Sequence, residues 1–211
     1  GIRDLSLWLE FRRGSSDLEF MRKHSNDKYY LQLDIRKYYY NINHNILRNF
    51  ISKKIKDERI VNLIMLFVDT AKGIGLFVGN VLSQLFGLIY LNPLDHFIKR
   101  VLKIKHYIRY VDDFVLVGLE KSEAHILKSK IESFLKDNLN LELSKFRIAK
   151  IKQGCNFVGF RTWQSMKFIR KHTLHNFSKA VKLQKEASII SILGHAKHSS
   201  SHKYLISKLG A

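Results

Sequence analysis

Apolar and polar residues alternate along several short stretches of the chain, which is the pattern of strands with one buried face. The clearest stretch covers residues 29–35, where the apolar positions end with Ile35 and Asp34 lies on the opposite face. Two further apolar runs, residues 106–111 and 114–118, predict a β-hairpin with a pair of aspartates at its tip. Three carboxylates are therefore expected at the ends of strands that are otherwise built to be buried.

More strands are expected in the second half of the chain. Leucines alternate over residues 139–143 and predict one strand. Residues 147–152 and 155–161 lie on either side of a Gln-Gly pair and predict a second β-hairpin. From residue 167 onward, the apolar spacing is helical.

Helical spacing of apolar residues separates these strands. Two helices are predicted over residues 42–51 and 58–68. A third follows a glycine-rich loop and runs toward Pro93, and a fourth is expected to have Ser122 as its cap. The predicted order is strand, helices, two strands, helix, strand and helices. This order predicts an α+β fold, with an antiparallel sheet and helices on one face, because a doubly wound parallel sheet needs regular alternation of strands and helices.

Residues 73–94 carry no charge and are numerous enough to span a bilayer. Small and polar residues nevertheless recur among them at helical spacing, at Asn80, Ser83, Gln84 and Gly87. A glutamine in the middle of a membrane span is unfavourable. We therefore expect a mostly buried helix with one narrow face that another group approaches closely, and no membrane partner.

The chain has 211 residues, a net charge of +19 and 45% hydrophobic residues. The hydrophobic share excludes disorder by composition, and the length predicts one domain or slightly more. The charge and a pI near 10.0 point to a polyanion, with nucleic acid favoured over an anionic membrane surface. A single cysteine, Cys155, excludes an internal disulfide and indicates a reducing, cytoplasmic location. Because the chain opens with Gly1 and has no signal-peptide pattern, a piece of a longer reading frame is expected.

Asp34, Asp112 and Asp113 are candidates for a shared metal site. If the strands that carry them are neighbours in the sheet, the three carboxylates converge and repel one another unless cations lie between them. Oxygen ligands suit Mg²⁺ or Mn²⁺, and two such ions about 4 Å apart can clamp the attacking and leaving oxygens of a phosphoryl transfer. The alternative is structural, since aspartate is a common turn residue and a pair at a hairpin tip needs no function.

Three motifs, in the same order along the chain, resemble those of reverse transcriptases. Residues 110–113 read Tyr-Val-Asp-Asp, which matches the family's Tyr-x-Asp-Asp motif on an apolar hairpin. Residues 33–39 read Leu-Asp-Ile-Arg-Lys-Tyr-Tyr and resemble its first catalytic motif. Residues 78–84 read Val-Gly-Asn-Val-Leu-Ser-Gln, where the family has its template- and nucleotide-binding helix. The resemblance implies the right-hand polymerase fold and RNA-templated DNA synthesis, in which dNTPs are added to a primer 3′-hydroxyl.

The Val-Gly-x-x-x-Ser-Gln form of the middle motif resembles the reverse transcriptases of diversity-generating retroelements, whereas many intron-type enzymes read Gln-Gly-x-x-x-Ser-Pro there. This subtype implies error-prone copying of template adenines. Two departures are Phe77, where the family usually has proline, and residues 87–88, where it has Ala-Asn. A group II intron-like or phage-defence reverse transcriptase is the second hypothesis, and a non-catalytic RNA-binding fragment of such a polymerase is the third.

The resemblance also implies a role for individual residues. The three aspartates would be the catalytic residues. Two Mg²⁺ or Mn²⁺ ions would be held by Asp34, Ile35, Asp112 and Asp113. Tyr39 would lie under the sugar and exclude a 2′-hydroxyl, with a place in the core as the alternative for this tyrosine or its neighbours. The other candidates for nucleotide binding are Lys37, Tyr38, Val78, Gly79, Gln84 and Lys145. The candidates for contact with template and primer are Asn80, Ser83, Tyr110, Arg161, Arg170, Lys171, His195 and Lys197. For Gln84 and Asn80, hydrogen bonds between the helix and the sheet are an equal alternative.

Residues 161–211 contain ten Lys and Arg and a single acid, Glu186. With its interleaved aromatic residues, this segment suits contact between a thumb and the backbone of an RNA–DNA duplex, and a solvated basic face is the alternative. His195, His198 and His202 are spaced so that they could share one face of a helix, but a zinc site requires a fourth ligand and none is close in the sequence. The predicted organisation is a fingers remnant at 1–28, a palm at 29–160 with a fingers insertion near 50–78, and a thumb region at 161–211.

The expected partners follow from the same resemblance. They are template RNA, a DNA or RNA primer and dNTPs, together with a small basic accessory protein. The fingers segment that normally precedes the first catalytic motif carries basic residues for the triphosphate, and most of it is absent from these 211 residues. The fragment is therefore expected to bind nucleic acid but to polymerise poorly without the rest of its reading frame.

Overall fold

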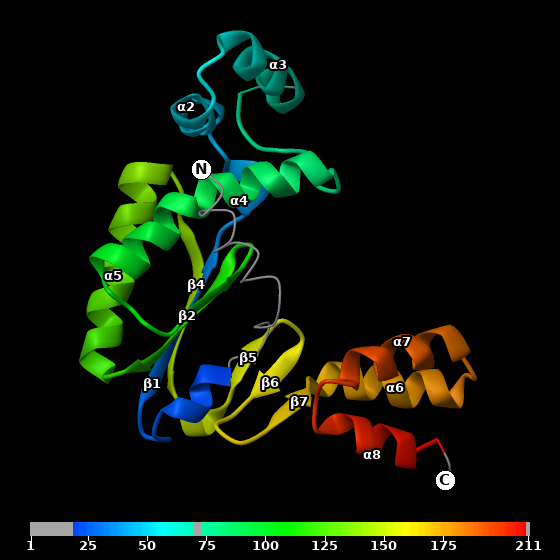
Figure 1. Ribbon diagram of the computed structural model, residues 1–211. Helices are drawn as coiled ribbons and strands as arrows, with labels where there is room; N and C mark the ends of the chain where they lie inside the picture. The colour runs from blue at the N-terminus through cyan, green and yellow to red at the C-terminus, as the bar shows by residue number, and fades with distance from the viewer. Residues whose placement is uncertain (1–18, 70–72, 210–211) are drawn as a thin grey trace. The chain divides into compact units, whose positions relative to one another are not determined.

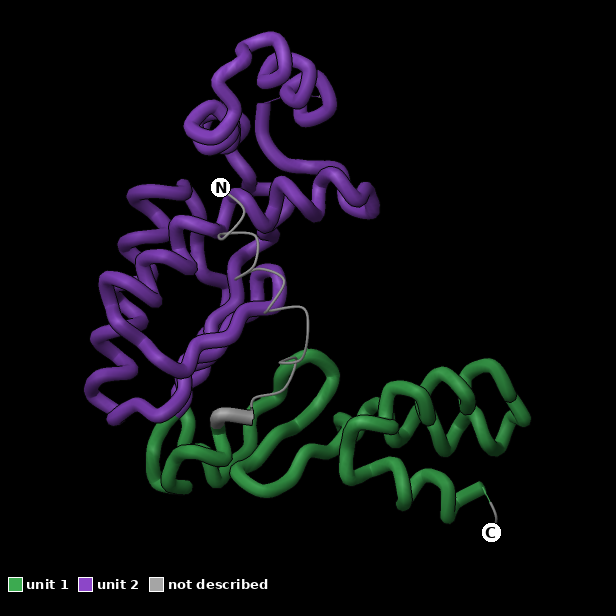
Figure 2. Tube along the Cα trace, in the orientation of Figure 1, with its two compact units in different colours: residues 1–29, 149–211 green, residues 30–148 purple. Residues whose placement is uncertain are grey.

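The computed structural model describes residues 19–69 and 73–209. The chain forms two compact units (Figure 2). The central unit comprises residues 30–148, and the terminal unit comprises residues 1–29 and 149–211. Residues 1–18 of the predicted fingers remnant lie outside the described part of the chain.

The central unit is built on a four-stranded sheet in the order β2-β3-β1-β4 (Figure 1). The strands are β1 (Tyr29–Ile35), β2 (Tyr107–Tyr110), β3 (Asp113–Leu119) and β4 (Leu143–Lys150). The helices are η2 (Tyr38–Asn41), α2 (His44–Lys54), α3 (Glu58–Val68), α4 (Val81–His96), the π-helix η4 (Phe97–Val101) and α5 (Lys121–Leu139). Helices α4 and α5 cover one face of the sheet (Figure 1). This arrangement confirms the predicted α+β class with helices on one face.

The predicted hairpin of the central unit forms as an antiparallel pair. Strands β2 and β3 are in register from Tyr107 opposite Leu116 to Tyr110 opposite Asp113. Four consecutive residues of β3, from Phe114 to Val117, are buried, because helices cover one face of the sheet and the strand lies inside it. The tight turn between the strands leaves both aspartates of the motif at one end of the sheet.

Side-chain caps explain where the helices of the central unit begin. Asn43 and Asn80 accept backbone N–H bonds at the starts of α2 and α4, which satisfies donors that have no partner within the helix. The expected cap at Ser122 is wrong. Helix α5 begins two residues earlier than a Ser122 cap would place it. Its cap is Glu120, whose backbone N–H donates to the Glu123 carboxylate at 3.2 Å in a capping box.

The strand predicted over residues 139–143 is also wrong in its first part. Leu139 is the last residue of α5, and Asn140 ends the helix in the left-handed region, with φ of 51°. Strand β4 begins only at Leu143. Leucines at alternate positions are compatible with one continuous strand and also with a helix that ends shortly before a strand begins. The pattern alone therefore did not distinguish these two structures.

In the described residues, the terminal unit contains a three-stranded antiparallel sheet, three α-helices and two short 3₁₀ helices. Its elements are η1 (Glu19–Lys23), η5 (Ile151–Gln153), β5 (Cys155–Phe157), β6 (Phe160–Thr162), β7 (Lys167–Ile169), α6 (Lys171–Lys182), α7 (Glu186–Ala196) and α8 (Ser201–Ser207). Its core brings Phe160 and Ile169 of the sheet together with Phe177, Ala196 and Leu205 of the helices. The predicted helical pattern from residue 167 therefore begins after a short strand.

The second predicted hairpin has a different turn. Strand β5 pairs with β6 around residues 158–159, not with β4 around residues 153–154. Both turn residues have positive φ, 43° at Val158 and 82° at Gly159, as a two-residue hairpin turn requires. A valine gives no sequence signal for a left-handed turn, whereas the Gln-Gly pair does.

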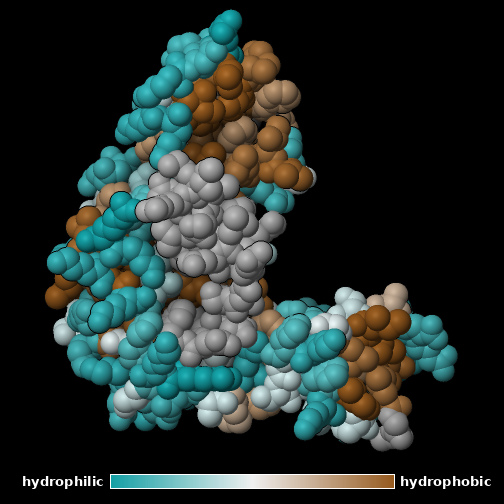
Figure 3. Space-filling view, viewed as in Figure 1, coloured by the Kyte–Doolittle hydropathy of each residue, from teal (hydrophilic) through white to brown (hydrophobic). Residues whose placement is uncertain are grey.

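Helix α3 keeps an apolar face exposed. Leu66 and Phe67 are more than half exposed, while Val61 and Met65 are buried, and the apolar surface over α3 is visible in Figure 3. None of the helices in the described ranges is both long and apolar enough to cross a membrane.

Candidate active site

Asp34 lies near the end of β1, half-buried, where strand β4 runs beside it. The Ser144 hydroxyl of β4 donates to an oxygen of the Asp34 carboxylate and, at 3.2 Å, to its backbone carbonyl. The backbone N–H of Arg36 donates to the carbonyl of Glu142 at 2.8 Å, which fixes the strands on either side of the contact. Ser144 thus orients the carboxylate, and sequence reasoning did not single it out.

Asp112 lies in the turn between β2 and β3, next to the end of β1. Its carbonyl accepts the backbone N–H of Ile35 at 3.3 Å. Burial raises the pKa of the Asp112 carboxyl, and the negative charge of Asp34 raises it further. Asp34 and Asp112, two of the three carboxylates that were expected to converge, therefore repel each other, and a cation between them would relieve both effects.

Asp113 has a different environment from the other two aspartates. The side-chain amide of Gln32 donates to both oxygens of its carboxylate, at 3.0 and 3.3 Å. Gln32 precedes Asp34 by two residues in a strand, so both side chains project from the same face of β1. Among the residues that the structure describes, no three His, Cys, Asp or Glu side chains gather closely enough to hold a metal ion. Asp34 and Asp112 therefore lie close enough to repel each other, while Asp113 is engaged by the Gln32 amide.

The tyrosines after β1 divide between core and site. Tyr38 is buried, and its hydroxyl donates to the carbonyl of Gly87 in α4. Tyr39 is half-buried near the turn that carries Asp112, where burial and then the charge of Asp112 raise the pKa of its phenol. Tyr38 is thus a core residue, which was the alternative for at least one of these tyrosines, while Tyr39 lies near Asp112.

The narrow face of α4 receives these two tyrosines. A Cβ added at Gly87 would lie 2.9 Å from Cε1 of Tyr39 and 3.3 Å from Cε1 of Tyr38. The group that approaches this helix closely is therefore part of the same fold. Gly87 is required because any larger residue displaces the ring that borders the carboxylate pair.

A substitution tests this close approach. We expect Gly87→Ala to lower the free energy of unfolding by about 1–3 kcal/mol because the new methyl group overpacks the tyrosine rings. Gly194→Ala is the matched control, since Gly194 is also helical but has open space around its Cβ position. That control is expected to gain about 0.5–1 kcal/mol from helix propensity. Chemical denaturation measures both, and equal effects of the two substitutions would contradict the assignment.

The loop before α4 is held by a buried histidine. His44 Nδ1 lies 2.8 Å from a carboxylate oxygen of Asp69, and Nε2 lies 2.7 Å from the carbonyl of Gly75. The backbone N–H of Gly75 donates in turn to the carbonyl of Ile42. No local pattern pointed to His44, because its partners lie more than twenty residues away along the chain.

The candidates of the loop and α4 differ in exposure. Val78 is 64% exposed, and Gly79 has φ of 105° with open space around it. Gln84 is exposed, whereas Ser83 is buried and faces the inside of the unit. The Asn80 side chain accepts the N–H of Leu82 and caps α4, a local structural role that differs from the expected bond between helix and sheet.

Three further candidates lie close in sequence to Asp34, Ser144 or Asp112. Lys37 is exposed and has φ of 44°, so the chain turns sharply after β1, and its carbonyl accepts the Tyr40 N–H. Lys145 is exposed on β4, directly after the serine that contacts Asp34. Tyr110 of β2 is 58% exposed.

The basic candidates of the terminal unit are of two kinds. Arg170, Lys171 and Lys197 are exposed near the ends of α6 and α7. Arg161 instead lies over the Trp163 ring at 4.9 Å and donates to the carbonyl of Gln153. The exposed His195 ring stacks on the buried Phe160 at 4.4 Å between centroids. Arg161 and His195 therefore each have a partner within the unit.

Comparison with known proteins decides the family. Residues 1–162 match the family model described as reverse transcriptase (RNA-dependent DNA polymerase). The chain belongs to the reverse transcriptase family. No curated protein matches this reverse transcriptase chain.

Solved structures share its fold. Telomerase from Candida albicans in complex with the TWJ fragment of telomeric RNA is 13% identical, with a TM-score of 0.61, over 97% of this chain and 46% of that one. Apo telomerase from Candida tropicalis, truncated from the C-terminal domain, is 20% identical with a TM-score of 0.56, over 77% and 38%. The foamy viral protease-reverse transcriptase in complex with an RNA/DNA hybrid is 17% identical with a TM-score of 0.50, over 92% and 25%. This reverse transcriptase chain thus spans less than half the length of these three structures.

Proposed function

We propose that the protein containing this chain is an RNA-templated DNA polymerase. The observation that carries the proposal is the pairing of Asp34 with Asp112 at one end of the sheet, on the two motifs where a reverse transcriptase needs carboxylates. In the reaction, the primer 3′-hydroxyl attacks the α-phosphorus of a dNTP, a new phosphodiester bond forms, and pyrophosphate leaves. Primer extension with and without an RNA template tests this proposal.

Divalent cations fit this site through Asp34 and Asp112, with the Ile35 carbonyl as a further oxygen ligand. Mg²⁺ or Mn²⁺ would supply positive charge for the phosphate oxygens and orientation for the reacting groups. The chain's own contribution is positioning: Ser144 orients the Asp34 carboxylate, and Gln32 holds Asp113 in place. The backbone N–H groups of Lys37 and Tyr38 remain proposed contacts of the nucleotide, as do Gly79, Gln84 and Lys145.

Tyr39 is proposed to exclude ribonucleotides. We expect Tyr39→Ala to raise the incorporation of ribonucleotides relative to deoxyribonucleotides by about tenfold or more, since the ring no longer fills the space beneath C2′. Tyr40→Ala is the control, because Tyr40 is 65% exposed and has no place at the site in this proposal. Competition between rNTPs and dNTPs in primer extension measures the ratio. An unchanged ratio in Tyr39→Ala would show that another residue excludes the 2′-hydroxyl.

The diversity-generating retroelement type is the proposed subtype. It is supported by the Val-Gly-x-x-x-Ser-Gln motif and by the exposure of Val78, which is not packed into the fold. An intron-like or phage-defence enzyme is the alternative. The proposed organisation is the palm at 29–160, with the fingers insertion near 50–78 and the thumb at 161–211. The proposed partners are template RNA, a primer, dNTPs and a basic accessory protein.

Fidelity tests the subtype. Val78 can only make apolar contacts, whereas a glutamine can hydrogen-bond the nascent pair and respond to its geometry. We expect Val78→Gln to lower misincorporation opposite template adenine by roughly tenfold or more. One hydrogen bond that forms only with a correctly shaped base pair provides discrimination of about this size. Sequencing the cDNA that both forms make on one RNA measures this. Equal error spectra would show that Val78 has no part in discrimination.

A further inference from the structure

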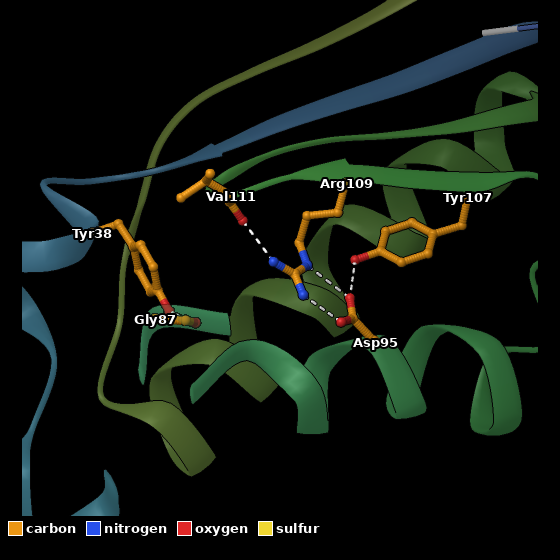
Figure 4. A network of polar contacts seen from close by, with 6 residues as sticks. All are labelled: Tyr38, Gly87, Asp95, Tyr107, Arg109 and Val111. Carbon is orange, nitrogen blue, oxygen red and sulfur yellow. Dashed lines mark hydrogen bonds and ion pairs between the residues drawn. The ribbon is translucent and has the colours of Figure 1, made fainter. Parts of the chain in front are cut away.

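A buried ion pair lies between the sheet and α4, directly behind the catalytic turn (Figure 4). The side chains of Arg109 and Asp95 are 6% and 21% exposed. Arg109 Nε donates to Asp95 Oδ1 at 2.8 Å, and Nη2 donates to the other oxygen, so the contact is bidentate. The Tyr107 hydroxyl also donates to Asp95 Oδ1, at 2.7 Å. Both β2 side chains point toward the helix that carries Asp95 (Figure 4).

Arg109 makes a third contact that is independent of the ion pair. Its Nη1 donates to the carbonyl of Val111 at 2.9 Å. Val111 has φ of 57°, in the left-handed region, which is unfavourable for a β-branched residue. A conformation of this kind persists only where surrounding contacts hold it, and the Arg109 bond is one such contact. The next residue is Asp112.

The guanidinium group suits this double task better than any other side chain. It is planar and presents several N–H groups in fixed directions, so two can engage Asp95 while another reaches Val111. Burial lowers the pKa of Arg109, but the charge of Asp95 and its hydrogen bonds outweigh burial and raise it, so the group stays charged. Lysine has a single nitrogen and cannot bond both partners in this geometry.

We propose that Arg109 is a positioning residue for the polymerase reaction: anchored by Asp95 on α4, it holds Val111 in its left-handed conformation and so directs the Asp112 carboxylate toward Asp34. This inference rests on the proposed function. If the ion pair had a purely structural role, its loss would lower the stability of the unit but leave the rate of primer extension by the folded protein unchanged.

The test compares Arg109→Lys with Arg48→Lys in the full reading frame. Arg48 also forms an ion pair, with Glu58, at the surface of the same unit. For Arg109→Lys we expect kcat for primer extension to fall about 10–100-fold, because a displacement of about 1 Å at a reacting group has effects of this size. KM for dNTP should stay within about threefold, since the nucleotide contacts themselves are unchanged. Arg48→Lys should keep parental values.

A measurement without catalysis accompanies the kinetics. Mn²⁺ binding, followed by electron paramagnetic resonance, should weaken about tenfold or more in Arg109→Lys, because residues that orient a ligand contribute this much to metal affinity. Circular dichroism establishes that the variants are folded. A folded Arg109→Lys with parental kcat and parental Mn²⁺ affinity overturns the proposal.

A second substitution separates positioning from stability. Glycine adopts positive φ without strain, so Val111→Gly should restore at least part of kcat in the Arg109→Lys background. A purely structural ion pair predicts no such rescue, and its absence would count against the proposal. If Arg109→Lys does not fold, Tyr107→Phe removes one bond to Asp95 and should lower kcat about fivefold, and an unchanged kcat there overturns the proposal. Absence of templated extension by the parent and by Arg48→Lys would instead contradict the proposed function itself.

Discussion

Replacing Asp112 with alanine is expected to lower the rate of RNA-templated primer extension at least about a thousandfold, because the substitution removes half of the carboxylate pair that fits the cations. Asp34→Ala should have a loss of similar size. Asp112 lies in a half-buried turn and contributes its backbone, not its side chain, to the bond with the Ile35 N–H. The fold and the binding of RNA should therefore survive both substitutions.

Asp137→Ala provides the matched control for these variants. Asp137 is an exposed aspartate of α5 and has no part in the site, so its loss should leave extension unchanged. Rates are measured on a defined primer and RNA template in the full reading frame, and filter binding measures RNA affinity. Extension by Asp112→Ala within tenfold of the parent would contradict the assignment of Asp112 to the reacting centre.

The second large effect concerns salt. A chain with a net charge of +19 is expected to bind an RNA–DNA duplex through phosphate contacts that release counterions. With about six to ten such contacts, affinity should fall about 10³- to 10⁵-fold between 50 and 200 mM salt. Fluorescence anisotropy of a labelled duplex measures this dependence on residues 1–211 alone.

Single substitutions localise the salt effect. Lys171 and Lys197 are exposed and belong to the proposed thumb, so replacing either with alanine should reduce the slope of log K against log salt by about one. Lys136→Ala, on the exposed side of α5, should leave the slope unchanged. An affinity that does not respond to salt would show that the basic charge is a solvated surface.

The parts of the fold that the sequence predicted are those fixed by local patterns. Strand β1 occupies the predicted residues 29–35, and α3 occupies the predicted 58–68, because regular periodicity ran to the ends of both elements. The hairpin that carries the aspartates also forms as expected. The turn at Val158 and the end of α5 at Leu139 were not predictable in this way, because tertiary packing outweighed the local signal.

The site shows the same division. That Asp34 and Asp112 lie near each other was predictable from the sequence, but not all of the residues that contact the aspartates were. Gln32 was open to prediction, since it lies two positions before Asp34 on the same strand face. Ser144 contacts Asp34 only through the register of β4 with β1, which no local pattern encodes. The burial of Tyr38 likewise depends on Gly87, whose missing side chain makes room for the ring.

The most direct measurement of the central claim is the sequence of the product made on a defined RNA. The full reading frame that contains this chain is given the RNA, an annealed primer, four dNTPs and Mg²⁺, and the extended strand is sequenced. We expect DNA that is complementary to the template apart from misincorporations, and no product from the Asp112→Ala variant. Binding of the RNA without templated DNA synthesis would contradict the account and leave an RNA-binding protein with a polymerase fold.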